Sequence, residues 1–166
     1  MATAKINDIV KRFKTLSELH PSINNFGCGQ LDDLDNQDVV NYPYLWVLLD
    51  SPHNLIYSED NGYRAIEFNI VLRIGDKKSL QTGYENIGGI GKDNQLDATS
   101  NTFQYMLDFI NTISEDSLDM FGDVSLIDDV SIEPFFNEGG GDDLGYEASI
   151  TLRVKNDKVC INPLTV

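Results

Sequence analysis

Basic residues are scarce in this chain. Twelve lysines and arginines stand against 27 aspartates and glutamates, so the formal net charge at pH 7 is −15. Such a chain repels the phosphates of nucleic acids, whereas proteins that grip DNA or RNA neutralise them with lysine and arginine. The composition therefore argues against a nucleic-acid-binding module.

The few cations are also unevenly placed. A third of them, Lys5, Lys11, Arg12 and Lys14, lie near the N-terminus, while residues 115–143 hold ten carboxylates and no lysine or arginine. A solvated acidic face is one interpretation. The other is that acidic and basic faces meet between neighbouring subunits, because complementary potentials set register and partner choice.

Long apolar runs are missing. The longest, Tyr44–Leu49, has the length of a buried strand and falls far short of the roughly 18 residues that a membrane span needs. The segment after Lys5 is amphipathic, unlike the continuous apolar region of a secretory signal. We therefore expect no membrane contact and no signal for export.

Cysteine is rare. Cys28 and Cys160 are far apart and form no CxxC or CxxH cluster. Because cysteines of reducing compartments stay free, we predict two free thiols in a cytosolic setting. A bridge between the N-terminal loop and the C-terminal tail stays open as the alternative.

Catalytic motifs are missing too. His20 and His53 lie in no metal-binding or triad pattern, and the chain has no GxSxG elbow. Cys28 lies between two glycines, but the sequence shows no base that would activate it as a nucleophile. The run Gly88–Lys92 resembles the end of a phosphate-binding loop, yet Asp93 stands where that loop needs serine or threonine. We predict a protein that is not an enzyme and binds no cofactor.

One acidic segment superficially resembles a calcium loop. Asp33 and Asp35 have the spacing of its first two ligands, but Asp38 replaces the required glycine and Tyr44 the bidentate glutamate. This excludes an EF-hand, and we expect no bound metal. Solvated loop carboxylates are the default interpretation. A looser cation site stays open beside it, with the candidate residues Asp32, Asp33, Asp142 and Asp143.

What the chain does have is the length and pattern of one globular domain. Its 166 residues are 41% hydrophobic, which is enough for a core without staples. Apolar residues recur at helical spacing between Thr3 and His20, and Pro21 ends that helix. Residues 22–42 are polar and acidic, and we interpret them as a connector or interaction arm.

Strand patterns follow this connector. The run 44–49 is typical of a central strand, and the short apolar segment 55–57 leads into the hairpin turn Asn61-Gly62. From 65 to 74, apolar residues alternate with a second, mostly polar set that ends at Arg73. That alternation predicts a strand with one buried face.

The second half repeats helix and strands. A long glycine-containing loop, residues 75–96, precedes a helix predicted over residues 97–113. Two closing strands, 124–132 and 145–155, are joined by an acidic hairpin tip at residues 137–144. The order is α-β-β-(β)-α-β-β. Because hairpins join consecutive strands, we predict an α+β fold whose mainly antiparallel sheet carries both helices on one face.

Aromatic residues give further candidates. Trp46, in the middle of the apolar run, is interpreted as core rather than as a ligand platform. Phe135 and Phe136 are adjacent on a strand, so their side chains point to opposite faces. One of them is expected to be exposed as an anchor for a partner protein. Burial of both by neighbouring loops is the alternative.

The order of elements resembles the ring-forming tail-terminator and tail-completion proteins of tailed bacteriophages. The closing hairpin is similar to theirs, in particular its "asp, leu, gly, aromatic" segment before the last strand, and the opening of the first strand is similar as well. The composition, rich in asparagine, aspartate and isoleucine, also resembles crAss-like phages. The segments that carry the likeness are Asn41–Trp46, Val130–Phe136, Gly141–Tyr146 and Ser149–Arg153.

The resemblance implies a virion protein, assembled in the host cytoplasm, that forms an oligomeric ring of the tail-terminator or head–tail connector type. Its partners would be copies of itself and neighbouring portal, connector or tail proteins, with DNA passing through the lumen only as cargo. An acidic lumen fits this role because nothing in it holds phosphates. The family offers no catalytic residue. The expected interface residues are Lys11, Arg12, Lys14, Asp32, Asp33, Asp35, Phe135, Phe136, Asp142 and Asp143.

Two other functions stay open. An acidic adaptor in a bacterial cytoplasm, in particular a DNA mimic, would use the charge of −15 to bind a host protein. An enzyme acting on a small molecule at the glycine loop would need Lys92. A single basic host partner would favour the first of these, and a saturable ligand the second.

Overall fold

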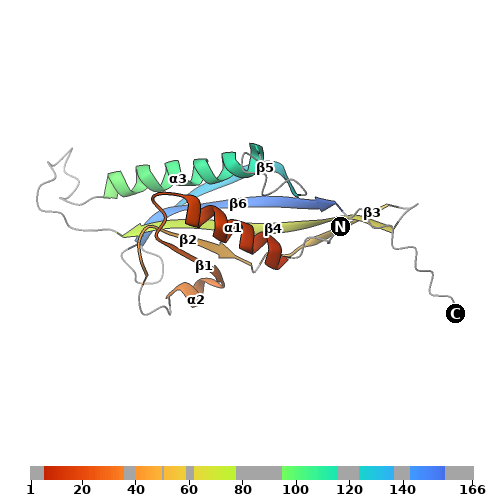
Figure 1. The fold of residues 1–166 in the computed structure, drawn as a ribbon, viewed down its shortest axis with the longest axis horizontal. Helices are drawn as coiled ribbons and strands as arrows, with labels where there is room; N and C mark the ends of the chain where they lie inside the picture. The colour runs from red at the N-terminus through yellow and green to blue at the C-terminus, as the bar shows by residue number, and fades with distance from the viewer. Residues whose placement is uncertain are drawn as a thin grey trace, which may run out of the picture.

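The computed structural model describes residues 6–35, 40–49, 51–58, 62–77, 95–115, 124–136 and 143–155. Figure 1 shows a long twisted sheet with helices packed along it. The predicted α+β class is confirmed. The elements, in chain order, are α1 (Ile6–Leu19), β1 (Asn25–Gly29), α2 (Leu31–Asp35), β2 (Tyr44–Leu48), β3 (Asn54–Ser58), β4 (Gly62–Lys77), α3 (Gln95–Glu115), β5 (Val124–Phe136) and β6 (Asp143–Lys155).

The sheet is ordered β1-β2-β4-β6-β5, and β3 pairs with the first part of β4. The pairs β2–β4, β3–β4, β4–β6 and β5–β6 are antiparallel, whereas β1 and β2 run parallel. The strand β4 is therefore central. It pairs with β3 as a hairpin, and Asn61 of the predicted turn lies outside the described residues. A register shift between Ile127 and Ser131 interrupts the pairing of β5 with β6.

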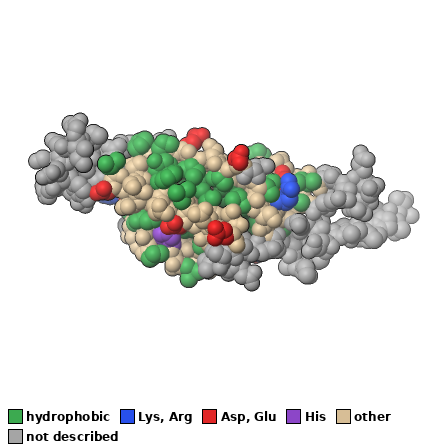
Figure 2. Space-filling model, turned by 90° about the horizontal axis from the view of Figure 1, so that it is seen from above, with side chains coloured by type: hydrophobic (Ala, Val, Ile, Leu, Met, Phe, Trp, Pro, Cys, Tyr) green, Lys and Arg blue, Asp and Glu red, His purple; other side chains and the backbone are tan. Residues whose placement is uncertain are grey.

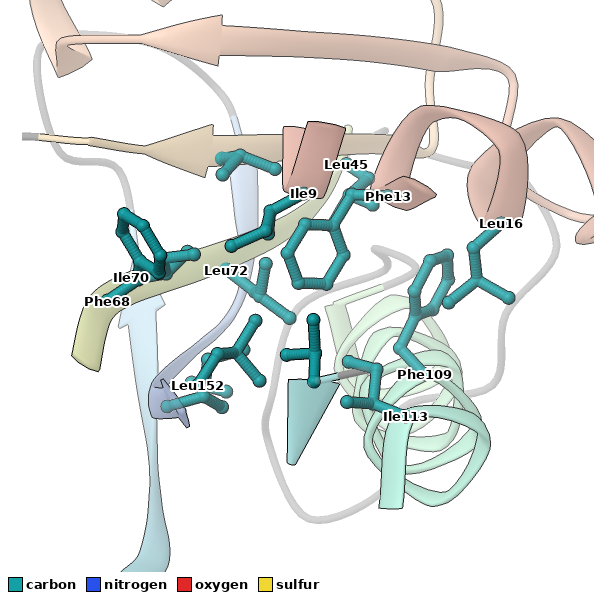
Figure 3. Packing of buried hydrophobic residues seen from close by; sticks show 14 of the residues in the cluster. Ile9, Phe13, Leu16, Leu45, Phe68, Ile70, Leu72, Phe109, Ile113 and Leu152 are labelled. Atoms are coloured by element: carbon teal, nitrogen blue, oxygen red, sulfur yellow. The ribbon is translucent and has the colours of Figure 1, made fainter. Parts of the chain in front are cut away.

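α1 and α3 lie on one face of this sheet, called here the helix face (Figure 1). Both helices bury apolar stripes of the predicted kind, and the apolar side chains of β4 and β6 meet them. The buried alternation on β4 is confirmed for Phe68, Ile70, Leu72 and Ile74. Figure 3 shows α1 and α3 contributing to the same cluster, with labelled residues Ile9, Phe13, Leu16, Leu45, Phe68, Ile70, Leu72, Phe109, Ile113 and Leu152.

The opposite face, called here the second face, carries a smaller apolar cluster. Leu34 of α2 packs there with Tyr44, Trp46 and Leu48 of β2. The prediction that Trp46 belongs to the core is confirmed, because only 3% of it is exposed. Further along this face the side chains of β4, β6 and β5 are mainly polar.

The structure corrects the predicted order of elements. Residues 22–42 are not only a connector, because they contain the strand β1 and the short helix α2. Since α2 packs on the second face, the helices do not all lie on one face of the sheet. Local pattern missed β1 because Asn25–Gly29 holds two glycines and no alternation. Its strand geometry comes from pairing with β2, a contact that is not local.

Two predicted loops are shorter than expected. β4 continues to Lys77 and α3 begins at Gln95, so only residues 78–94 of the 75–96 loop lie outside the described residues. At the hairpin tip 137–144, β5 reaches Phe136 and β6 begins at Asp143. Residues 137–142 of that tip lie outside the described part of the chain.

Candidate functional site

A buried polar cluster lies on the second face, centred on Arg73. The Arg73 Nη1 donates a hydrogen bond to Glu147 Oε1 at 2.7 Å, and its Nε donates to the Tyr44 hydroxyl at 3.2 Å. The Tyr44 hydroxyl donates in turn to Asp143 Oδ2 at 2.6 Å. The guanidinium carbon of Arg73 lies 3.6 Å from the centre of the Phe135 ring, a cation–π contact. The cluster therefore joins β2, β4, β6 and β5.

The alternation along β4 predicts that Arg73 lies on the side opposite the buried one, and that expectation of exposure is wrong. Only 1% of Arg73 is accessible. Its burial is tolerable because two carboxylates, a hydroxyl and an aromatic ring surround the charge. The partners lie 29 to 74 residues away along the chain. No local pattern could have identified them.

Glycines make room for this cluster. Gly75 and Gly145 are cross-strand partners, and Tyr44 pairs with Gly75 on the next strand. A Cβ atom at Gly75 would overlap the Tyr44 ring, and one at Gly145 would overlap the Ile74 carbonyl oxygen. The tyrosine side chain can lie flat across the sheet toward Asp143 only because Gly75 has no side chain.

The surroundings shift the pKa values of two members of the cluster. Burial raises the pKa of the Tyr44 hydroxyl far above its ordinary range, and the hydrogen bond to Asp143 adds to the rise. Burial alone would lower the pKa of Arg73, but its interactions with Tyr44 and Glu147 raise it overall. Tyr44 therefore stays protonated as a donor and Arg73 stays charged.

The second face also holds a second ion pair. Arg153 donates to Glu67 Oε1 through Nε at 3.0 Å and through Nη2 at 2.5 Å. Nearby, Thr151 donates to the side-chain oxygen of Asn69 at 3.1 Å. Carboxylates neutralise Arg73 and Arg153 on this face, and Lys77, exposed at the end of β4, is a further described cation on the same side of the strand.

The predicted basic residues of α1 lie on its outer surface. Lys11 and Lys14 are exposed and pair with Asp8 at 3.9 Å and Glu18 at 3.8 Å on the same helix. Arg12 is half-buried. Exposed pairs of this kind contribute little to stability.

The predicted acidic residues have different positions. Asp32, Asp33 and Asp35 belong to α2, where Asp33 Oδ2 accepts a hydrogen bond from the Gln30 backbone N–H at 2.9 Å. This contact supports the turn into α2. Asp143 was expected at an exposed hairpin tip, but it is 8% exposed and engaged in the Arg73 cluster. Asp142 lies outside the described residues.

The two adjacent phenylalanines do point to opposite faces. Phe135 is buried on the second face beneath Arg73, whereas Phe136 is 47% exposed on the helix face. The prediction that one of them is exposed is confirmed, and its role as an anchor stays a prediction. Figure 2 views the molecule from above α3, where exposed hydrophobic side chains gather over the middle of the surface. Exposed apolar residues on this side also include Leu96 and Phe103 of α3.

A hollow of about 260 Å³ lies between α1 and β1. Its polar lining on α1 includes Lys14 and Glu18, and its apolar lining at β1 is Ile23 and Phe26. Sequence analysis missed this hollow because it had not recognised β1. Cys28, one of the two cysteines, is exposed on the same strand.

Groups suited to metal or acid–base chemistry are sparse in the described part of the chain. No three His, Cys, Asp or Glu side chains gather there in a way that could hold a metal ion. His20 joins α1 to α3, since its Nε2 lies 3.6 Å from Asp108 Oδ2 and its ring stacks on Phe109. None of the described helices is long and apolar enough to cross a membrane.

No known protein family and no curated protein matches this chain.

Proposed function

We propose that the protein is a virion structural protein that forms a homo-oligomeric ring in the neck or tail of a tailed phage. It would be of the tail-terminator or head–tail connector type. In this role the second face lines a lumen through which DNA passes, and α1 and α3 lie on the outer side. Neighbouring portal, connector or tail proteins would stack above and below.

The pairing of both described second-face arginines with carboxylates carries this proposal. Arg153 is paired with Glu67 and Arg73 with Glu147, so the charge of each arginine is balanced by a carboxylate on the same face. Glu133, exposed on β5, adds a further negative charge to the same face. Protein surfaces that hold DNA do so by replacing its counterions with lysine and arginine. Because its two arginines are paired with carboxylates, the second face offers DNA few cations that would hold it.

Quantitative mass spectrometry of purified virions of the encoding phage tests the proposal. The expected result is a fixed number of copies per particle, a whole ring's worth relative to the portal protein. Absence from particles would overturn it.

The charge of −15 supports a second candidate, an acidic adaptor or DNA mimic acting on a host protein. A pull-down from host lysate distinguishes the two. A single basic host protein bound at nanomolar affinity, together with absence from virions, would favour the adaptor. Recovery of the chain itself or of other virion proteins would favour the ring.

A further inference from the structure

The apolar side chain of Phe136 is not packed into the core of its own domain. It lies at the end of β5 on the helix face, 47% exposed. α3 packs mainly over β6 and β4 and less over β5, and Phe136 belongs to neither of the buried clusters. An exposed aromatic at a sheet edge is a typical interface anchor.

The two ends of the sheet have compatible directions. β1 runs parallel to β2, and each following neighbour through β4, β6 and β5 reverses direction, so β1 and β5 point opposite ways. A rotation that keeps the strand direction would set β1 of a second copy antiparallel to β5 of the first. Within the described strands, β1 pairs only with β2 and β5 only with β6. In this described part of the sheet, both outer edges therefore lack a partner on their outer side, and the edge-protecting features of the two edges differ.

The register also brings the two edges to the same level. One row of cross-strand partners runs through Asn25, Tyr44, Gly75, Gly145 and Phe135. Phe136, one residue beyond this row, stands level with Asn24 at the other edge. Asn24 lines the hollow between α1 and β1. The exposed ring and the hollow therefore lie at the same height on opposite ends of one subunit.

The hollow is large enough for an aromatic ring and is partly apolar. A cavity of roughly 150 Å³ can accept a benzene ring, and the hollow measures about 260 Å³. Ile23 and Phe26 offer apolar contact to an aromatic ring, and the other lining residues are polar, namely Lys14, Ser17, Glu18, Asn24 and Asn25. The two edges also differ in their protection. β5 has a register shift, a proline and the exposed carboxylates Asp129 and Glu133, whereas β1 carries no charge.

We propose that Phe136 of one copy inserts into the α1–β1 hollow of the next copy, while β5 pairs with β1 across the same contact. This inference rests on the proposed ring and names its subunit interface. The contact is heterologous, as a closed ring requires. Ring closure adds tilt and a stagger of the strands, so the cross-linking positions span two residues on either side of the level row.

Removing the Phe136 ring tests the insertion. In the full chain, Phe136→Ser should raise the dissociation constant of the oligomer at least about tenfold, as measured by native mass spectrometry over a concentration series. Leu55→Ser is the matched control, because Leu55 is 53% exposed but lies on β3, away from both edges. Circular dichroism should show both variants folded, since neither side chain is buried.

Cross-linking tests the strand pairing independently. A second row runs through Cys28, Val47, Leu72, Ala148 and Ile132 on the helix face. Cys160 is first replaced by serine (Cys160→Ser), so that Cys28 is the remaining native thiol. One cysteine at a time is then introduced on the helix-face side of β5, to be cross-linked to Cys28 of the neighbouring copy. A short bismaleimide should then give a ladder of covalent oligomers on a denaturing gel, and the ladder should end at the closed ring. The test variants are Val130→Cys, Ile132→Cys and Pro134→Cys, and the control on the other face is Ser131→Cys.

The outcomes separate the interface from the ring itself. Rings without the ladder, or rings that persist unweakened in Phe136→Ser, would overturn this inference and leave the proposed function standing. A chain that is monomeric at every concentration and absent from virions would overturn both. A ladder at a helix-face position together with weakened assembly of Phe136→Ser would establish the contact.

Discussion

Tyr44 shows how a single residue can connect the two halves of the chain. Its hydroxyl donates to Asp143 and accepts from Arg73, and all three side chains are buried. Each of these groups lost its water on folding, so each depends on the others for hydrogen bonds. The tyrosine therefore stabilises two charges that would otherwise be costly to bury.

Tyr44→Phe should lower the free energy of unfolding by about 1–3 kcal/mol, because it leaves the buried Asp143 and Arg73 each short of one hydrogen bond. Urea denaturation measures the change. Tyr105→Phe is the control, since the hydroxyl of Tyr105 has no hydrogen-bond partner among the described residues, and its stability should stay near that of the parent. Equal stability of the two variants would show that the cluster does not stabilise the fold.

Asp76 gives the fold a pH dependence. Burial raises the pKa of its carboxyl group, and the hydrogen bond from the Lys77 backbone N–H offsets the rise only in part. The folded chain therefore binds this proton more tightly than the unfolded chain. The resulting stabilisation is complete below the ordinary aspartate pKa and is lost as the pH rises through the raised folded value.

Asp76→Asn removes the free-energy cost of keeping this carboxylate ionised in a partly buried position at neutral pH. At neutral pH the variant should be more stable by up to about 0.5 kcal/mol, and its urea midpoint should change less than that of the parent between acidic and neutral pH. In the control Asp129→Asn, at an exposed position on β5, the urea midpoint should change with pH as it does in the parent. A steeper slope in Asp76→Asn would contradict the sign of the shift.

At the scale of elements, sequence patterns predicted what depends on local periodicity. The helices α1 and α3 and the strands from β2 to β6 follow from stripes and alternation that each segment carries itself. β1 and α2 were missed because their stability comes from contacts with β2. Alternation alone predicted that one of Phe135 and Phe136 is exposed, without saying which. The hollow and the Arg73 cluster could not be predicted, since both join segments distant in sequence.

Gly27 explains why β1 has so little sequence signal. It pairs with Trp46 of β2, and a Cβ atom at Gly27 would overlap the indole ring. The glycine that lets the tryptophan cover β1 is also a residue that weakens any strand pattern.

Gly27→Ala should cost about 1–3 kcal/mol, because either the Trp46 ring or the β1 backbone must move. A lower urea midpoint and a change in tryptophan fluorescence would report it, since the chain has a single tryptophan. Cys28→Ala, at the exposed neighbouring position, should stay within about 0.5 kcal/mol of the parent. An unchanged midpoint in Gly27→Ala would mean that β1 does not depend on this contact.

At the scale of the whole molecule, the sheet separates two environments. The helix face is closed by α1 and α3 and buries the main core, while the second face is polar over β4, β6 and β5. The net charge of −15 belongs to the whole chain, so it does not by itself say which face meets DNA. Removing equal charge from the two faces makes that distinction.

The double variant Glu67→Gln/Glu133→Gln takes two carboxylates from the second face and releases Arg153 from its ion pair. The double variant Asp97→Asn/Glu115→Gln takes two exposed carboxylates from α3 on the helix face. Each changes the net charge from −15 to −13, by removal of two negative charges. If the second face lines the lumen, only the first should bind duplex DNA measurably. The retention of this first variant on DNA-cellulose should fall steeply with added salt, because phosphate contacts release counterions. Equal elution of the two variants from DNA-cellulose would contradict the assignment of the second face to the lumen.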